Sequence, residues 1–252
     1  MVHNVAAEGF NDPGDYEAAR PSYPPEAVAW FVEHLQVGPG RHVADLAAGT
    51  GKLTRLLAPS GAELLAVEPI PGMRATFRRV LPQVPLVAGT AEAMPFAAAS
   101  LDAITVAQAW HWFDHERATA EAARVLRSGG GLGLVWNARD RSVPWVDEVW
   151  SIMDRVEKHA PWRDHEWRNT ALEAMPGFGE LHEAEFRHVQ QTTPEGVVQR
   201  VASVSHVAVL SEPEREKVLD EVRRVLATHP AVRGRETVEI PYRVDCFWAQ
   251  RS

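Results

Sequence analysis

A turn of small residues over positions 46–51 carries the first sign of ligand chemistry in this sequence. It follows Asp45, which closes a short apolar segment, and it contains Gly49 and Gly51. Glycines let the backbone turn tightly and approach a bound ligand closely. Where such a turn opens a helix, the unpaired N–H groups of the first helical turn face that ligand. The segment therefore predicts a site for a nucleotide or nucleoside.

Two common nucleotide-binding motifs fit this turn poorly. A P-loop needs a glycine, four residues and then Gly-Lys-Ser/Thr, but here Leu46 stands at the first glycine and Leu53 follows Lys52. A dinucleotide fingerprint needs G-x-G-x-x-G, and Thr54 stands at its third glycine. The sequence excludes the first motif and leaves the second as a weak alternative.

Glu68 closes the second apolar segment, over positions 64–68. A carboxylate at a strand end can accept charge-assisted hydrogen bonds from both hydroxyls of a ribose. Dinucleotide sites use the same carboxylate, so Glu68 alone does not separate two classes of cofactor. Ile70 and Met73 follow it, and they are candidates either for contact with an adenine ring or for the ordinary core.

The segment Gln-Ala-Trp-His-Trp-Phe over 108–113 stands where a substrate would lie. His111 is the candidate general base, because an ordinary histidine pKa of about 6.5 suits proton removal at neutral pH. It could instead only shape the pocket, and a substrate that reacts through a carboxylate would need no base. Trp110 and Trp112 are candidates either for lining the substrate site or for the core.

Composition and spacing exclude several other classes of protein. The chain has 252 residues and a formal net charge of -8, whereas nucleic-acid binders normally carry a basic surplus. No stretch approaches the roughly 18 apolar residues of a membrane-spanning helix, and the first ten residues lack a leader pattern. The spacing of His159 and His165 does not match a compact metal-ligand set, and Cys246 is typical of a buried hydrophobe. We expect a cytoplasmic protein that acts on a small molecule and binds neither membranes nor nucleic acid.

An alternation of apolar and amphipathic segments must position these residues. Strands are expected over 42–47, 63–68, 85–89, 102–109 and 132–136, and helices over 25–36, 50–58, 71–81 and 115–126. Such alternation requires crossover connections, and therefore a parallel sheet with helices on both faces. Further strands are expected at about 183–192 and 237–250, with helices at about 194–204 and 213–229.

The ordered motifs between 42 and 137 resemble those of class I S-adenosylmethionine-dependent methyltransferases. The turn after Asp45 resembles the first motif of that family, with Ala47 in place of its first glycine. The segment Gly-Thr-Ala-Glu-Ala-Met-Pro-Phe over 89–96 resembles the family's adenine-binding loop, with Thr90 in place of the usual aspartate.

Three more segments narrow the resemblance to the type 11 and trans-aconitate-methyltransferase-like branch. They are the tryptophan-rich segment over 108–113, Val-Trp-Asn over 135–137, and Tyr-x3-Arg-Pro-x-Tyr-Pro over 16–24. The resemblance implies that S-adenosylmethionine binds at the strand ends and leaves as S-adenosylhomocysteine. It implies these contacts with the cofactor: Tyr16, Arg20, Asp45, Ala47, Gly49, Thr50, Gly51, Glu68, Pro69, Ile70, Met73, Thr90, Ala91, Glu92, Gln108 and Ala109. The acceptor is expected beside Tyr23, Trp110, His111, Trp112 and Asn137.

The resemblance also implies a Rossmann-like three-layer α/β sandwich. Its seven-stranded sheet would be mostly parallel, with an antiparallel last strand and a helical cap inserted after the fifth strand. We expect one domain, monomeric or homodimeric, with an arm over 1–24, a cofactor-binding core over 38–137, a cap over 140–178 and a C-terminal part over 179–252.

Methyl transfer to a small molecule is the expected reaction, with a hydroxyl or carboxylate oxygen as the expected acceptor. The alternatives are an NAD-dependent oxidoreductase and a protein that binds S-adenosylmethionine without catalysis. The tryptophans of the cap indicate a hydrophobic or aromatic acceptor, whereas the trans-aconitate resemblance indicates a small carboxylate. The sequence leaves these two possibilities open.

Overall fold

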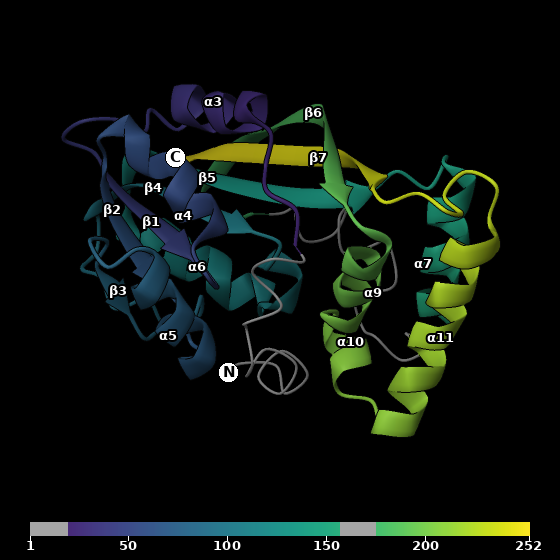
Figure 1. Ribbon diagram of the computed structural model, residues 1–252. Helices are drawn as coiled ribbons and strands as arrows, with labels where there is room; N and C mark the ends of the chain where they lie inside the picture. Colours follow the sequence, from purple (N-terminus) through teal and green to yellow (C-terminus); the bar gives the residue numbers. More distant parts are fainter. Residues whose placement is uncertain (1–19, 157–174) are drawn as a thin grey trace.

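A seven-stranded sheet runs through the part of the chain that the computed structural model describes, residues 20–156 and 175–252 (Figure 1). The strand order is β3-β2-β1-β4-β5-β7-β6. The strands are β1 (His42–Leu46), β2 (Glu63–Val67), β3 (Leu86–Val87), β4 (Leu101–Ala107), β5 (Leu126–Arg139), β6 (Phe178–Thr192) and β7 (Val238–Arg251). The pairs among β1 to β5 are parallel, and β7 is antiparallel to both β5 and β6. The predicted fold class, including the antiparallel last strand, is confirmed.

Helices cover both faces of this sheet. On one face, α3 (Pro25–His34) and α4 (Lys52–Leu57) bury apolar side chains against β1, β4 and β5. The helix α5 (Pro71–Val80) packs on Ala66 of β2. Ala66 lies two positions after Leu64 and therefore on the same face of the sheet. The opposite face is covered by α6 (His115–Val125). The sheet thus lies between two layers of helices, and the loops at its strand ends lie at the edge between these layers.

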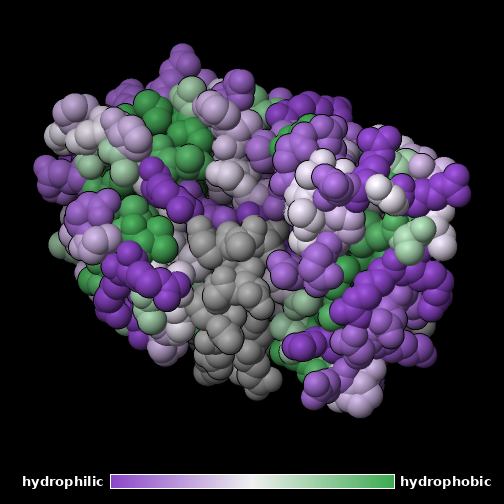
Figure 2. All heavy atoms as spheres, in the orientation of Figure 1, coloured by the Kyte–Doolittle hydropathy of each residue, from purple (hydrophilic) through white to green (hydrophobic). Residues whose placement is uncertain are grey.

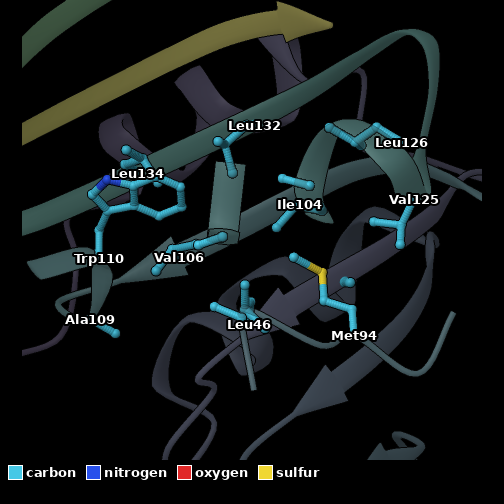
Figure 3. Close-up of a cluster of buried hydrophobic side chains, with 14 of the residues drawn as sticks. Leu46, Met94, Ile104, Val106, Ala109, Trp110, Val125, Leu126, Leu132 and Leu134 are labelled. Carbon is cyan, nitrogen blue, oxygen red and sulfur yellow. The ribbon is translucent and has the colours of Figure 1, made fainter. Parts of the chain in front are cut away.

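The core under α6 contains apolar side chains from several strands of the sheet (Figure 3). Leu46, Ile104 and Leu134 come from three neighbouring strands. Trp110, from the short 3-10 helix η2 (Trp110–Trp112), is fully buried, and its indole ring lies close to Leu134 in Figure 3. Burial of this kind contributes about 1.5–3 kcal/mol for each large apolar side chain.

A second hydrophobic cluster holds together the helices beside the far ends of β5, β6 and β7 (Figure 1). These helices, here called the helical unit, are α7 (Pro144–Val156), α9 (Pro194–Ala202), α10 (Ser205–Ala208) and α11 (Glu212–Thr228). The predicted cap supplies α7, while the other three helices lie between β6 and β7 in the chain. Residues 157–174 of that cap, which include its two histidines, lie outside the described residues. None of the helices that the structure describes is long and apolar enough to cross a membrane.

The fifth strand starts earlier than the sequence predicts. The fifth strand is expected over 132–136, but β5 begins at Leu126, which pairs with Leu101 of β4. A shift of register follows between Leu101 and Ala103, and Gly129 adopts a φ of 77°. A bulge that accommodates an unpaired stretch of one strand explains why glycines occur here within a strand.

Close approach of α3 to the sheet depends on the absence of a side chain at Gly133 of β5. A Cβ atom there would lie 2.7 Å from Leu35 Cδ1 and 2.8 Å from Phe31 Cε1. Both neighbours are fully buried, so they have little room to move. The glycine therefore sets the distance between α3 and the sheet.

We predict that Gly133→Ala destabilises the protein by about 1–3 kcal/mol, because overpacking a core forces side chains from their preferred rotamers. The free energy of unfolding in urea measures the loss. Gly179→Ala in β6 is the matched control, since the nearest atom to its new Cβ would be Gln250 O at 3.7 Å. Equal losses in the two variants would contradict the packing argument.

Candidate functional site

A cavity of about 810 Å³ lies at the carboxyl ends of β1, β2, β4 and β5 and extends to the helical unit. This volume is within the usual range of about 300–1,000 Å³ for sites of small ligands. Ligands of open parallel sheets bind at this edge, because the loops that follow the strands meet there. We call the part lined by these loops the sheet half, and the part lined from Trp136 onward, together with Arg20, the helical half.

Most of the residues predicted for the site line this one cavity. They are Arg20, Ala47, Gly49, Glu68, Pro69, Ile70, Met73, Thr90, Ala91, Glu92, Gln108, Ala109, His111, Trp112 and Asn137. Segments separated by as many as 117 positions in the chain, from Arg20 to Asn137, thus meet at one edge of the sheet. What each of them binds remains a prediction.

Five predicted site residues do not line the cavity, and Tyr16 lies outside the described residues. Tyr23 and Trp110 were expected beside the acceptor, but Tyr23 is buried in the core under α3 and Trp110 in the core under α6. Their rings fill apolar space, so the expectation that they line the acceptor site is replaced by a place in the core. Asp45 is buried within β1, and Thr50 and Gly51 are buried residues of the loop that follows it.

Asp45 is a buried carboxylate that ties β1 to its neighbours. Thr54 donates a hydrogen bond from Oγ1 to Oδ2 at 2.5 Å, and Thr105 donates from Oγ1 to Oδ1 at 3.1 Å. Burial raises the pKa of Asp45 to about 6, although these hydrogen bonds oppose the rise. The first turn of α4 and the middle of β4 are thereby fixed to the end of β1.

The loop after β1 uses its glycines for two different purposes. Gly49 has a φ of 57°, and a Cβ atom there would meet no protein atom within 4 Å, so its backbone faces open space. At Gly51 a Cβ atom would lie 2.6 Å from Leu81 Cδ1 and 2.9 Å from Phe77 Cε2. Gly49 therefore permits close approach of a ligand, whereas Gly51 permits close packing of α5.

Glu68 forms the wall of the sheet half at the end of β2. Its Oε2 accepts a hydrogen bond from the N–H of Gly49, and its Oε1 accepts one from the N–H of Ile70, both at 2.8 Å. The side chain is only 3% exposed, and burial raises its pKa. Each carboxylate oxygen keeps further acceptor capacity. A fixed pair of acceptors of this kind suits the two hydroxyls of a ribose.

His111 lies in the cavity as a neutral imidazole. Burial, with the charge of His115 as a smaller cause, lowers the pKa of His111 to about 4. The indole Nε1 of Trp136 donates a long hydrogen bond to Nδ1 of His111, at 3.4 Å. Because Nδ1 accepts, the ring proton is on Nε2. This arrangement favours a hydrogen-bond donor over a general base, whose pKa should be near the working pH.

The helical half contains the residues that sequence reasoning missed. Six arginines line it, against four carboxylates, in a chain whose overall charge is negative: Arg20, Arg139, Arg141, Arg187, Arg200 and Arg243, with Asp140, Asp154, Glu185 and Asp245. Residues 139–141 lie at the carboxyl end of β5, and this position could have indicated them. No sequence pattern indicates those on α9, β6 and β7, because only the packing of the helical unit brings them to the cavity.

Several of these arginines are neutralised by a carboxylate of the same half. Arg187 pairs with Asp140 at 3.0 Å, and Arg141 pairs with Asp154 at 2.7 Å. The guanidinium of Arg139 lies over the Trp150 ring, 5.1 Å from its centroid. Within residues 20–156 and 175–252, no group of three or more His, Cys, Asp or Glu side chains could hold a metal ion.

Comparison with known proteins finds similarity to methyltransferases. The family described as "Methyltransferase domain" matches residues 44–134. An uncharacterized methyltransferase of Mycobacterium tuberculosis is 44% identical over 236 residues, 94% of this chain and 92% of that protein. An uncharacterized methyltransferase-like protein of Schizosaccharomyces pombe is 36% identical over 254 residues, 100% of this chain and 99% of that protein.

One solved structure shows the same fold at lower sequence identity. It is a proposed methyltransferase of an antibiotic biosynthesis pathway from Anabaena variabilis. Its TM-score with this chain is 0.65 at 22% identity, and the match covers 91% of this chain and 98% of that one. The curated relatives and this structure are matched almost from end to end, so the helical unit is included in the comparison.

We predict that Asp45→Asn removes a pH-dependent loss of stability. Since the folded pKa is about 6 and the ordinary value is 3.8, the folded state retains the proton longer, and stability declines as pH rises between these values. The difference in free energy of unfolding, variant minus wild type, should therefore increase by roughly 2–3 kcal/mol from pH 4 to 6.5. Urea unfolding across this range measures the difference, and a constant difference would contradict the assignment.

The protonation state of His111 can be measured without any substrate. Long-range ¹H–¹⁵N NMR of the histidine rings should show its Nε2–H tautomer throughout pH 6 to 8, with protonation only below about pH 5, because burial disfavours the cation. His111→Gln identifies the signal by its loss. Titration near pH 6.5 would restore the case for a general base.

Proposed function

Because this chain belongs to the class I S-adenosylmethionine-dependent methyltransferases of type 11, we propose that it methylates an oxygen atom of a small organic acceptor. The methyl donor is S-adenosylmethionine and the product cofactor is S-adenosylhomocysteine, as in the whole family. The observation that carries the proposal is one continuous cavity. Its sheet half has the fixed carboxylate of Glu68, and its helical half is rich in arginine.

The sheet half is the proposed site of the nucleoside. Glu68 would accept hydrogen bonds from the ribose hydroxyls, and the open backbone at Gly49 would lie against the methionine portion. Ile70, Met73 and Ala91 line the same half and offer apolar contact for an adenine ring. The residues present thus fit the cofactor in charge, shape and hydrogen-bonding capacity.

The helical half is the proposed site of the acceptor. Trp150, Met153 and Arg200 line it and are each no more than 3% exposed, so this part of its wall is buried. A recessed site of this kind suits a compact molecule and not a polymer. The overall charge of -8 also disfavours a nucleic-acid substrate.

Oxygen is the proposed acceptor atom because of charge and basicity. An amine is largely a cation at neutral pH, and the arginine surplus of the helical half would repel it. It would also have to lose a proton, for which His111 is a weak base. A carboxylate oxygen is already an anion and needs no base, whereas a hydroxyl must also lose its proton and would depend on the same weak base.

The work of the protein residues is mainly positional. S-adenosylmethionine, when bound, supplies a methyl group already activated by its positively charged sulfur. The loops after β1, β2 and β4 hold the two halves of the cavity in a fixed relation, and the buried wall of the helical half excludes water. Orientation of two reactants can lower a barrier by roughly 7–11 kcal/mol.

We predict that Glu68→Gln lowers the affinity for S-adenosylhomocysteine by about 10–100-fold, because hydrogen bonds to a charged acceptor contribute about 1.5–3 kcal/mol. Isothermal titration calorimetry measures the change. Glu63→Gln is the matched control, since Glu63 stands at the opposite end of the same strand with a largely exposed side chain. Unchanged affinity in Glu68→Gln would contradict the ribose assignment.

The function itself is tested with the wild-type protein. Calorimetry should show binding of S-adenosylmethionine and not of NAD. Mass spectrometry of incubations with panels of small carboxylic acids, phenols and amines should then show methylation of an oxygen-bearing compound. Methylation confined to amines would overturn the choice of oxygen, and failure to bind S-adenosylmethionine would overturn the function.

A further inference from the structure

Arg200, on α9, is a buried cation, and two of its donor atoms form no hydrogen bond with any described residue. Its side chain is 3% exposed and lines the helical half of the cavity. Among the described residues, its Nε and Nη1 atoms have no hydrogen-bond partner, and no carboxylate lies within ion-pair distance of it. Arg187 and Arg243, which line the same half, each pair with a carboxylate.

Such a side chain costs the folded protein free energy. Burying a charge is strongly unfavourable unless it is paired and hydrogen-bonded. The folded state therefore retains at Arg200 a cost that a bound anion would remove. The planar guanidinium presents two parallel N–H donors, a geometry that matches carboxylate and phosphate oxygens.

Two further polar atoms of the same cavity lack partners within the described part of the chain. They are the indole Nε1 of Trp150, a donor, and Oδ1 of Asn137, an acceptor. The Asn137 amide is held in place, because its Nδ2 donates to the carbonyl of Ser22 at 3.1 Å. The unpaired atoms of Arg200, Trp150 and Asn137 would be satisfied by a ligand that has anionic oxygens and one hydrogen-bond donor.

We propose that Arg200 and Trp150 form an oxyanion subsite for the methyl acceptor, with Asn137 accepting a hydrogen bond from the same molecule. The acceptor is then a small compound with a carboxylate or phosphate group. This inference rests on the proposed function, since it assigns the substrate class of that same cavity. Arg200 binds the anionic group and takes no part in proton transfer.

Four probes separate the sources of the anionic oxygen: benzoate, citrate, inorganic phosphate and benzamide, the neutral counterpart of benzoate. Each is titrated into the protein by calorimetry, with and without saturating S-adenosylhomocysteine. We expect benzoate or citrate to bind at least tenfold more tightly than benzamide, and Arg200→Met to lose at least tenfold of that affinity. Binding of phosphate alone, lost in Arg200→Met, would support the subsite and assign it to phosphorylated compounds.

Two more variants keep the test decisive. Arg200→Lys retains the charge without the planar fork and should recover only part of the affinity. Arg223→Gln makes the same change of net charge on α11, away from the cavity, and should bind the probes as the wild type does. The Tm of Arg200→Met without ligand should equal or exceed that of the wild type, because an uncompensated buried charge is removed.

Three results would overturn the proposal: equal binding of benzoate and benzamide, unchanged probe binding in Arg200→Met, or binding of none of the probes at millimolar concentration. A lower Tm together with unchanged probe binding would assign Arg200 to packing. The titrations without S-adenosylhomocysteine decide the subsite independently. Absence of S-adenosylhomocysteine binding in the wild type would therefore count against methyl transfer and not against Arg200.

Discussion

The sheet half of the site depends on two buried carboxylates at the ends of neighbouring parallel strands. Asp45 fixes the end of β1 to α4 and β4 through two threonine hydroxyls. Glu68 fixes the loop after β1 to the end of β2 through the N–H groups of Gly49 and Ile70. Both carboxyl groups have raised pKa values because they are buried, so their position has a cost in stability. The cost is consistent with a loop that must hold one conformation at a ligand site.

Two residues with a left-handed backbone lie at the same edge of the sheet. Ala47 has a φ of 54° and Gln108 a φ of 59°, in the left-handed region that residues with a Cβ atom rarely adopt. Both line the cavity, one after β1 and the other after β4. Ala47 stands where the motif that this turn resembles has a glycine, so this chain accepts strain that a glycine would avoid. Strain of this kind persists where the surrounding contacts determine the backbone, as the carboxylate ties do here.

The two halves of the cavity follow different rules of construction. The sheet half is made of consecutive loops whose position follows from the parallel sheet. The helical half is made of distant segments that converge: the end of β5, α7, α9, and the antiparallel pair β6 and β7. Arg20 donates a hydrogen bond to the carbonyl of Ser203, and Asn137 donates one to that of Ser22, so the segment before α3 joins both sides. The sheet half and the helical half are in this way joined into one cavity.

The sequence by itself determined the strand and helix alternation, and with it the edge of the sheet where Gly49, Glu68 and His111 meet. Such information is local, because the loops that follow parallel strands all lie at the same edge of the sheet. The family resemblance added the antiparallel last strand. The tertiary structure alone decided that Trp110 fills the core and that Arg200 reaches the cavity. Those outcomes depend on how helices pack over long separations in the chain, and neither hydrophobic periodicity nor residue type specifies that packing.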